Sequence, residues 1–552
     1  SDFSGKPAML YTTNMVWHFN GSDVNAKQAL FKTYFDYGSI DGKYTGGGTL
    51  TIANGTNITI DSINTADKTH ESDINKQNFL VGGSRVGTLH NTPKATIENK
   101  GTINLVGPFT IGFEAQTDTD NGSRIGQGER KIVNSGVITD KAETEEKYRG
   151  SGGLGGLTVG TIKEDGTEIT SPNEITLKTP LPIIGEDGLF ETKVKRTPDI
   201  VKADGTLIKK GGYTGYKVGM ILTEKDTDNE VNNTNKYSLI NKGTIEFNGK
   251  RSVGIDVYAP SKEIYKSGND NNPPFTNATI DVLNDKDGII AINGYDSYGM
   301  RLSSYVNKLE RFENKGTINV GNDKIETNNY GVNFGSVGMG VQTNYFTEHG
   351  LAAPAEDFDK NKFGSGYIGK VKNSGTINIY GTGNTAMNMY IDAPYTDTYY
   401  TKLLYNVNVV TNGDKNGNGT INLYGTKNLG LNAGEGSNFL EWQTGIHYFT
   451  MSRVTNNGTI NVYGKGNVAM NAGGTAALNQ AINLEKGTIN LKGKNNIAMW
   501  TFFFQSEGSN NFRTGEPQTI QEKYNLGPGN IINKGTIKSE GGENLTAMAI
   551  VG

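Results

Sequence analysis

The chain has 552 residues and a formal net charge of -4, with Lys and Arg scattered along it, so neither nucleic acid nor an anionic membrane is an expected partner. It contains no cysteine, which excludes a disulfide framework and any thiolate metal site. Hydrophobic residues make up only 34%, and no apolar run reaches about 18 residues, so the sequence predicts no transmembrane helix. The first residues do not begin a signal peptide.

One two-part unit recurs over most of the sequence. Its first half reads Asn-Asn-Gly-Thr-Ile-Asn-Val-Tyr-Gly at 456–464, and its second half reads Asn-Val-Ala-Met-Asn at 467–471. Further copies of the first half lie at 99–105, 241–245, 314–320, 373–379, 419–423, 487–491 and 533–537. Self-similarity on this scale is typical of a solenoid.

Alternation within the unit predicts a strand with one buried face, because Ile460 and Val462 point one way and the residues between them point the other. A repeated strand–turn–strand of this length predicts an all-β fold, a right-handed parallel β-helix whose coils hydrogen-bond to one another about 4.8 Å apart. Small residues in the second strand, such as Gly430 or Ala469, indicate a crowded place where two sheet faces meet.

Equivalent residues of successive coils should stack into ladders. The sequence predicts an asparagine ladder of Asn378, Asn422, Asn461 and Asn490, beside a tyrosine ladder of Tyr380, Tyr424 and Tyr463. A further row at the turn comprises Asn384, Asn428, Asn467, Asn496 and Asn544. Asparagine suits this turn because its side chain bonds local backbone and tolerates positive φ.

In chain order, residues 1–47 are expected to form an irregular capping segment, with a candidate short helix at 24–31. The first coils occupy 48–139. From 140 to 212 the repeat is absent, and three Asp-Gly pairs predict an inserted antiparallel β-hairpin subdomain. The main β-helix occupies 213–552, and it stops inside a repeat strand without a polar cap, which is typical of a fragment of a longer protein.

The spacing of the units varies although the strands keep their length, so the extra residues must leave as loops. Most of them follow the Ala-Met-Asn strand, which places them on one face of the solenoid. The loops are rich in aromatic residues, which favour recognition surfaces, although packing on the flank or an interface with missing parts of the chain would also explain them. The candidate binding residues are Tyr345, Phe346, Tyr390, Tyr395, Tyr399, Tyr400, Tyr405, Phe439, Trp442, His447, Tyr448, Phe449, Trp500, Phe502 and Phe503.

Signals for metal binding and catalysis are weak. Residues 414–419 match the front of a calcium loop, but its twelfth position is Gly425 in place of the bidentate Glu, so a solvated turn is favoured. The five histidines show no metal spacing, and carboxylates do not recur at a strand position. We therefore predict no cofactor, no metal and no catalytic residue. A polysaccharide-degrading β-helix enzyme remains the alternative, which a cleft lined by paired carboxylates would support.

The Asn-x-Gly-Thr-Ile-Asn rungs paired with Ala-Met-Asn strands, the aromatic insertions and the lack of cysteine resemble the passenger domains of large fusobacterial type V autotransporter adhesins of the RadD type. The resemblance covers most of 48–138 and 213–552 and leaves out 140–212. It implies type V secretion, an outer-membrane barrel that is not in this sequence, coaggregation with other bacteria and attachment to host cells in virulence. It supplies no catalytic residues.

We therefore expect an adhesin segment at the bacterial cell surface that acts by binding, without chemistry. Its expected partners are a host-cell receptor or surface glycan and other bacterial surfaces. A purely structural stalk, which only spaces a binding tip from the membrane, is the other alternative.

Overall fold

The computed structural model describes the following residues of the chain. They are 8–11, 15–18, 28–33, 39–40, 43–44, 47–61, 84–89, 94–106, 110–116, 128–141, 162–163, 175–179, 190–196, 200–201, 207–209, 213–214, 217–223, 236–249, 252–258, 276–294, 297–302, 306–321, 336–343, 369–391, 393–394, 409–433, 448–449, 453–472, 480–502 and 531–551.

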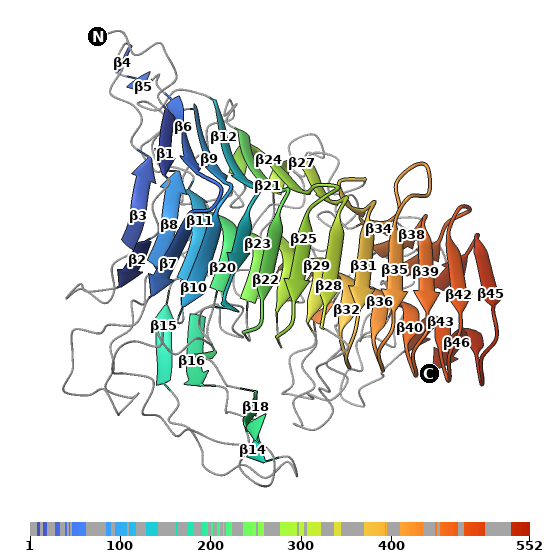
Figure 1. The fold of residues 1–552 in the computed structure, drawn as a ribbon. Helices are drawn as coiled ribbons and strands as arrows, with labels where there is room; N and C mark the ends of the chain where they lie inside the picture. The colour runs from blue at the N-terminus through green and yellow to red at the C-terminus, as the bar shows by residue number, and fades with distance from the viewer. Residues whose placement is uncertain are drawn as a thin grey trace.

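The described strands form three long parallel sheets of twelve strands each, stacked along one axis (Figure 1). Sheet A contains β1 (Ala8–Tyr11), β6 (Gly47–Ile52), β9 (Lys94–Asn99), β12 (Glu129–Asn134), β21 (Lys236–Asn241), β24 (Thr276–Asn284), β27 (Val306–Asn314), β30 (Val371–Asn373), β34 (Val409–Asn412), β38 (Arg453–Asn456), β41 (Gln480–Asn483) and β44 (Ile531–Asn533). Sheet B contains β2 (Met15–His18), β7 (Asn57–Asp61), β10 (Thr102–Val106), β13 (Val137–Thr139), β22 (Thr244–Phe247), β25 (Ile289–Ile292), β28 (Thr317–Val320), β31 (Thr376–Ile379), β35 (Thr420–Leu423), β39 (Thr459–Val462), β42 (Thr488–Leu491) and β45 (Thr536–Ser539).

Sheet C contains β3 (Gln28–Thr33), β8 (Ser84–Leu89), β11 (Thr110–Gln116), β20 (Lys217–Thr223), β23 (Ser252–Tyr258), β26 (Tyr298–Leu302), β29 (Val337–Thr343), β32 (Thr385–Ile391), β36 (Leu429–Ala433), β40 (Val468–Ala472), β43 (Ile497–Phe502) and β46 (Thr546–Val551). Each coil contributes one strand to each sheet in turn. The all-β parallel β-helix is therefore confirmed, although the sequence pattern indicated only two strands per coil and missed sheet A as a third wall.

A continuous apolar core fills the inside of the coils. Ile460 and Val462 of β39 are fully buried, as the alternation predicts, while Thr459 and Asn461, which alternate with them, are partly exposed. The equivalent isoleucines of sheet B are likewise fully buried; they are Ile58, Ile103, Ile138, Ile245, Ile290, Ile318, Ile377, Ile421 and Ile489. Burial of one such side chain is worth about 1.5–3 kcal/mol, so the stack of coils supplies the core that each coil lacks alone.

The small residues of sheet C do lie at a crowded place, as expected. A Cβ on Gly254 would lie 2.5 Å from the carbonyl oxygen of Gly299 in the next coil and 2.9 Å from Cγ2 of Ile290 in sheet B. Only a glycine fits there without a shift of the backbone. In later coils alanines take the small position, and Ala386 and Ala469 are fully buried.

An asparagine ladder that the sequence analysis did not name marks the corner between sheets A and B. Each member except the last donates Nδ2 to Oδ1 of its equivalent in the following coil at 2.7–2.8 Å. The members are Asn99, Asn134, Asn241, Asn284, Asn314, Asn373, Asn412, Asn456, Asn483 and Asn533, and all but the last are fully buried. We call this row the corner ladder.

The two ladders predicted on sheet B are confirmed. Asn422, Asn461 and Asn490 each donate Nδ2 to Oδ1 of the preceding member at 2.9 Å, and Asn319 continues the row on the other side of Asn378. The rings of Tyr380, Tyr424 and Tyr463 stack with centroids 5.1 and 5.0 Å apart.

The row at the turn between sheets B and C is confirmed for four of its five members. Oδ1 of Asn428, Asn467 and Asn496 each accepts the backbone N–H of the preceding member at 2.8 Å. The prediction for Asn544 was wrong. Ile497 pairs with Thr546, so Leu545, and not Asn544, lies opposite Asn496. Nδ2 of Asn544 donates instead to Oδ1 of Asn495. Positive φ, for which asparagine was expected to suit this turn, occurs at Asn544 but not at the four confirmed members; it falls one residue before two of them, at Lys427 and Asn495.

The N-terminal residues join the stack, contrary to the expectation of an irregular segment. β1, β2 and β3 pair in parallel with β6, β7 and β8, so the first described coil lies before residue 48. The helix predicted at 24–31 was wrong, because β3 occupies Gln28–Thr33. Pairing with a neighbouring coil outweighs local propensity here. β4 (Ser39–Ile40) and β5 (Lys43–Tyr44) form a separate antiparallel pair.

Between β13 and β20 the described strands are β14 (Ile162–Lys163), β15 (Ile175–Thr179), β16 (Phe190–Arg196), β17 (Ile200–Val201), β18 (Leu207–Lys209) and β19 (Tyr213–Thr214). β16 pairs antiparallel with β15 and β19, and β17 pairs antiparallel with β18 on either side of 204–205. β14 pairs in parallel with β17. The Asp-Gly pair at 165–166, which follows β14, therefore forms no hairpin among the described strands. The division of the chain into four domains stays a prediction.

Arg130 is an exception within the core of sheet A. Its side chain points inward with an exposed fraction of 1%, over the ring of Tyr237 at 5.1 Å. Nε and Nη1 have no hydrogen-bond partner in the described part of the chain. A buried guanidinium that meets no carboxylate among the described residues carries a desolvation cost that a cation–π contact offsets only in part.

Arg130→Met should therefore raise the stability of the protein by about 1–4 kcal/mol, because methionine fills a similar volume without a buried charge. The midpoint of thermal unfolding measures this gain. Lys131→Met is the control, since Lys131 is the partly exposed neighbour on the outer face and should give no comparable gain. A lower midpoint for Arg130→Met would mean that the guanidinium has a stabilising partner.

Candidate functional site

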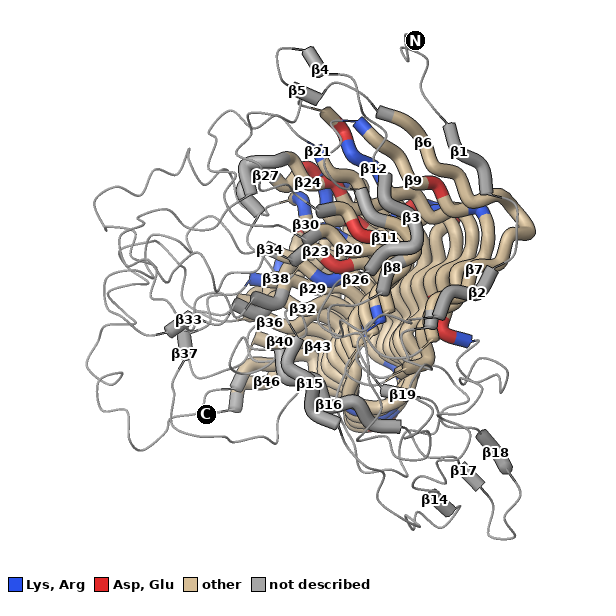
Figure 2. The backbone as a smooth tube through the Cα atoms, turned by 90° about the vertical axis from the view of Figure 1, so that its left-hand side faces the viewer, with Lys and Arg blue, Asp and Glu red and all other residues tan. Residues whose placement is uncertain are grey.

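The outer face of sheet A carries interleaved charges in the first half of the stack. Figure 2 shows acidic and basic segments side by side around β12 and β21. Arg311 pairs with Asp281 at 2.7 Å, and Lys236 pairs with Glu310 at 2.8 Å. The hydrogen bond to Asp281 raises the pKa of Arg311. These charges neutralise one another, so this face is a weak candidate for a binding site.

Sheet C is closed on its outer face as well as its inner one. Every residue of β26, β36 and β40 is buried. On the outer face of this sheet Asn432 and Asn471 each donate Nδ2 to the preceding asparagine at 2.8 and 2.7 Å. Sheet C therefore offers no open surface along these strands.

Buried charge on sheet C is paired across two coils. Arg301 of β26 grips Asp256 of β23 with two hydrogen bonds of 3.1 and 2.6 Å, and its guanidinium lies 5.3 Å from the centroid of the Tyr298 ring. A bidentate pair of this kind fixes the register between neighbouring strands.

The long connections of the second half of the stack leave at the corner between sheets C and A. The connection from β32 to β34 spans 392–408, and the one from β36 to β38 spans 434–452. Within them β33 (Ala393–Pro394) pairs antiparallel with β37 (Tyr448–Phe449). Connections of two successive coils are thus joined to each other.

The structure places part of the predicted aromatic set. Tyr390 lies on β32, Phe502 on β43, and Tyr448 and Phe449 form β37. Trp500 of β43 is partly exposed and lies opposite Asn471 in the register. The remaining candidates lie outside the described residues; they are Tyr345, Phe346, Tyr395, Tyr399, Tyr400, Tyr405, Phe439, Trp442, His447 and Phe503.

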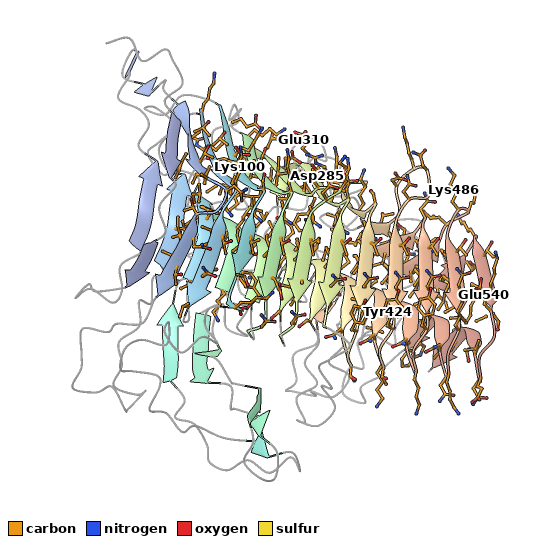
Figure 3. The ribbon with its side chains drawn as sticks, in the orientation of Figure 1. Lys100, Asp285, Glu310, Tyr424, Lys486 and Glu540 are labelled. Carbon is orange, nitrogen blue, oxygen red and sulfur yellow. The ribbon has the colours of Figure 1, made fainter. Side chains whose placement is uncertain are left out.

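The outer face of sheet B is open in the second half of the stack, from β31 to β42. Three rows run along it: Thr376, Thr420, Thr459 and Thr488; Asn378, Asn422, Asn461 and Asn490; and Tyr380, Tyr424 and Tyr463. Tyr424 is 42% exposed. Figure 3 places Tyr424 and Lys486 near opposite ends of these strands. We call this surface the sheet B face.

Lysines border the sheet B face. Lys427, Lys465 and Lys494 are exposed at the end where the chain turns toward sheet C, and Lys492 lies 5.2 Å from the centroid of the Tyr463 ring. Lys494 and Lys492 pair with Glu543 and Glu540 of the last coil at 2.6 and 2.8 Å. At the other end, Nζ of Lys486 donates to the carbonyl oxygen of Lys415 at 2.7 Å.

The loop that resembled a calcium site is closed on itself. Oδ1 of Asp414 accepts the backbone N–H groups of Asn416 and Asn418 at 2.8 and 2.9 Å, and Oδ2 accepts Nδ2 of Asn418 at 2.9 Å. Burial raises the pKa of Asp414, but the hydrogen bonds from Asn418 and Asn416 outweigh it and hold the pKa below its usual value. The described residues contain no group of three or more His, Asp or Glu that could hold a metal ion.

Asp414→Asn should make the loop less stable at neutral pH and less sensitive to acid. The folded-state pKa lies below the unfolded value of about 3.9, so the carboxylate stabilises the fold above that pH and loses this effect as the pH falls through the folded value. Thermal unfolding of wild type and variant between about pH 7 and 2 should show a difference that shrinks toward acid. Asp285→Asn, at a turn of an earlier coil, is the reference, and a difference independent of pH would contradict the assignment.

The described residues form no helix long and apolar enough to cross a membrane. Neither protein-family models, nor curated proteins, nor solved structures give a match to this chain.

Proposed function

We propose that this chain is an adhesin segment at a bacterial cell surface, similar to the passenger of a RadD-like autotransporter, and that it binds without catalysis. Its partners in this proposal are a host-cell receptor or surface glycan and the surfaces of other bacteria. The β-helix serves as a rigid scaffold, and the connections at the corner between sheets C and A make the contacts.

One observation carries the proposal: the pairing of β33 with β37 joins the connections of two successive coils. These two connections hold most of the predicted aromatic candidates, including Tyr395 and Trp442. Aromatic side chains supply the large, rigid contacts that dominate protein and glycan recognition.

A variant can remove these connections while keeping the coils. The connection from β40 to β41, residues 473–479, is a short link at the same corner and serves as a template. In the test variant it replaces both 392–408 and 434–452. In the matched control it replaces only 259–275, which links β23 to β24 at the same corner and holds none of the predicted binding residues.

Binding to host cells, to other bacteria and to a glycan array is measured for the three proteins, with thermal unfolding to check the fold. We expect wild type and control to bind and the test variant to lose binding while it keeps its unfolding midpoint. Equal binding by the folded test variant would overturn the proposed site.

A structural stalk is the second candidate, and the unbroken corner ladder from Asn99 to Asn533 favours it. A rod braced by buried side-chain hydrogen bonds suits a spacer. In that case adhesion by bacteria that display the protein survives the loop replacement and falls when whole coils are deleted.

A further inference from the structure

We propose that the sheet B face between β31 and β42 binds an extended acidic polysaccharide, one that carries uronate or sulfate groups. This surface is separate from the connections at the corner between sheets C and A. The inference does not rest on the proposed adhesive role of those connections.

The surface is regular, and its residues are partly or well exposed except for Asn422, which is 9% exposed. Its threonine, asparagine and tyrosine rows repeat once per coil, and the tyrosine centroids are spaced 5.0–5.1 Å apart along the axis. This repeat is of the same order as the length of one sugar ring in an extended glycan. A linear polymer lying along the axis can therefore present similar groups to successive coils.

The chemistry of the rows is hydrogen bonding. Threonine hydroxyls, asparagine amides and phenol groups both donate and accept. Burial, with the neighbouring tyrosines, raises the pKa of Tyr424, so its phenol keeps its proton at neutral pH and can donate to a carboxylate, a sulfate or a hydroxyl.

The ring faces are used within the ladder. Tyr424 stacks between Tyr380 and Tyr463 at interplanar angles of 15° and 7°, and Lys492 lies over the last ring. Apart from the second face of Tyr380, only ring edges and hydroxyls remain for a ligand. Single-stranded nucleic acid binds such grooves mainly through bases stacked on exposed aromatic faces, and a protein interface needs apolar anchors, so neither fits this surface well.

The charge of the border selects an acidic ligand. Lys427 and Lys465 are exposed in successive coils directly beside the tyrosine row and make no ion pair with the described residues. In the first half of the stack the rows are interrupted: β10 keeps Thr102 and Asn104, but β22 presents Glu246, which pairs with Lys141. Among the described residues, only the later coils therefore combine the threonine, asparagine and tyrosine rows with exposed lysines at their border.

The test uses the full chain and three soluble polymers: a sulfated glycosaminoglycan, a polygalacturonate and neutral dextran. Binding is measured by calorimetry at low and physiological salt. We expect the two acidic polymers to bind, more weakly as salt rises, and dextran not to bind. Failure of both acidic polymers, or equal binding of dextran, overturns the proposal.

Lys427→Gln with Lys465→Gln should weaken binding of the acidic polymers by roughly tenfold or more, since each lysine near an anionic surface contributes about 1 kcal/mol. The matched control is Lys242→Gln with Lys286→Gln, which makes the same charge change at exposed lysines of earlier coils. An equal loss in the control would show diffuse attraction of anions and overturn the site.

Tyr424→Phe with Tyr463→Phe keeps the ring stack and removes only hydroxyls, so it should weaken binding without a change in unfolding. A single-stranded oligonucleotide that binds as tightly as the glycans, and is displaced by them, would reassign the face to general polyanion binding. The variant lacking 392–408 and 434–452 should keep its affinity for the acidic polymers. Polymer binding to the sheet B face and cell binding by the proposed adhesive connections are therefore tested separately.

Discussion

Ile460→Asp is expected to open the coils around β39. Ile460 is fully buried between Ile421 and Ile489, so the variant places a carboxylate in an apolar stack with no partner. The cost should be roughly 4–5 kcal/mol or more. Because stability in a solenoid depends on neighbouring repeats, faster hydrogen exchange should appear first in β35, β39 and β42, followed by a lower unfolding midpoint.

Thr459→Asp is the matched control for this change. It introduces the same carboxylate one residue earlier, on the partly exposed outer face of the same strand. It should change the midpoint only slightly. Unchanged unfolding of Ile460→Asp would mean that the strand does not present Ile460 to the core.

Asn412→Ala should cost about 2–4 kcal/mol, the second largest effect we expect. Asn412 is fully buried in the corner ladder, accepts Nδ2 of Asn373 and donates to Oδ1 of Asn456, each at 2.8 Å. Alanine removes both bonds where no water can replace them easily. The midpoint of chemical or thermal unfolding measures the loss.

Asn461→Ala tests whether burial explains that effect. Asn461 also makes two side-chain bonds of 2.9 Å within a ladder, but it lies on the partly exposed sheet B face, where water can take their place. Its loss should be about 1 kcal/mol or less. Equal losses for the two variants would contradict the view that burial makes the corner ladder the stronger element.

Much of the fold was predictable because the same short pattern encodes the same strand in each coil. The alternation around Ile460 and the recurrence of Asn378 and Tyr380 were sufficient for the core face and two ladders. Sheet A was missed because its strands follow connections of variable length and share little beyond a final asparagine. That shared asparagine, present from Asn99 to Asn533, was the signal for the corner ladder.

The errors have local physical causes. Gly541 and Gly542 add one residue between β45 and β46 relative to the preceding coil, and this shifts Asn544 out of its row. The first coil lacks the Gly-Thr-Ile-Asn pattern, and only pairing with β6, β7 and β8 reveals it. For the candidate site, the sequence suggested aromatic residues whose role stays a prediction, and it could not show that β33 and β37 join two connections.

The side-chain hydrogen bonds of the asparagine ladders run in opposite directions along the axis, depending on the ladder. In the corner ladder every amide donates toward the following coil, whereas on sheets B and C the asparagines donate toward the preceding one. Rows of aligned amide dipoles polarise one another and so strengthen with length. Because these rows point in opposite senses along one axis, their dipoles oppose one another in the later coils, and the net dipole of the three rows is smaller than that of the corner ladder alone.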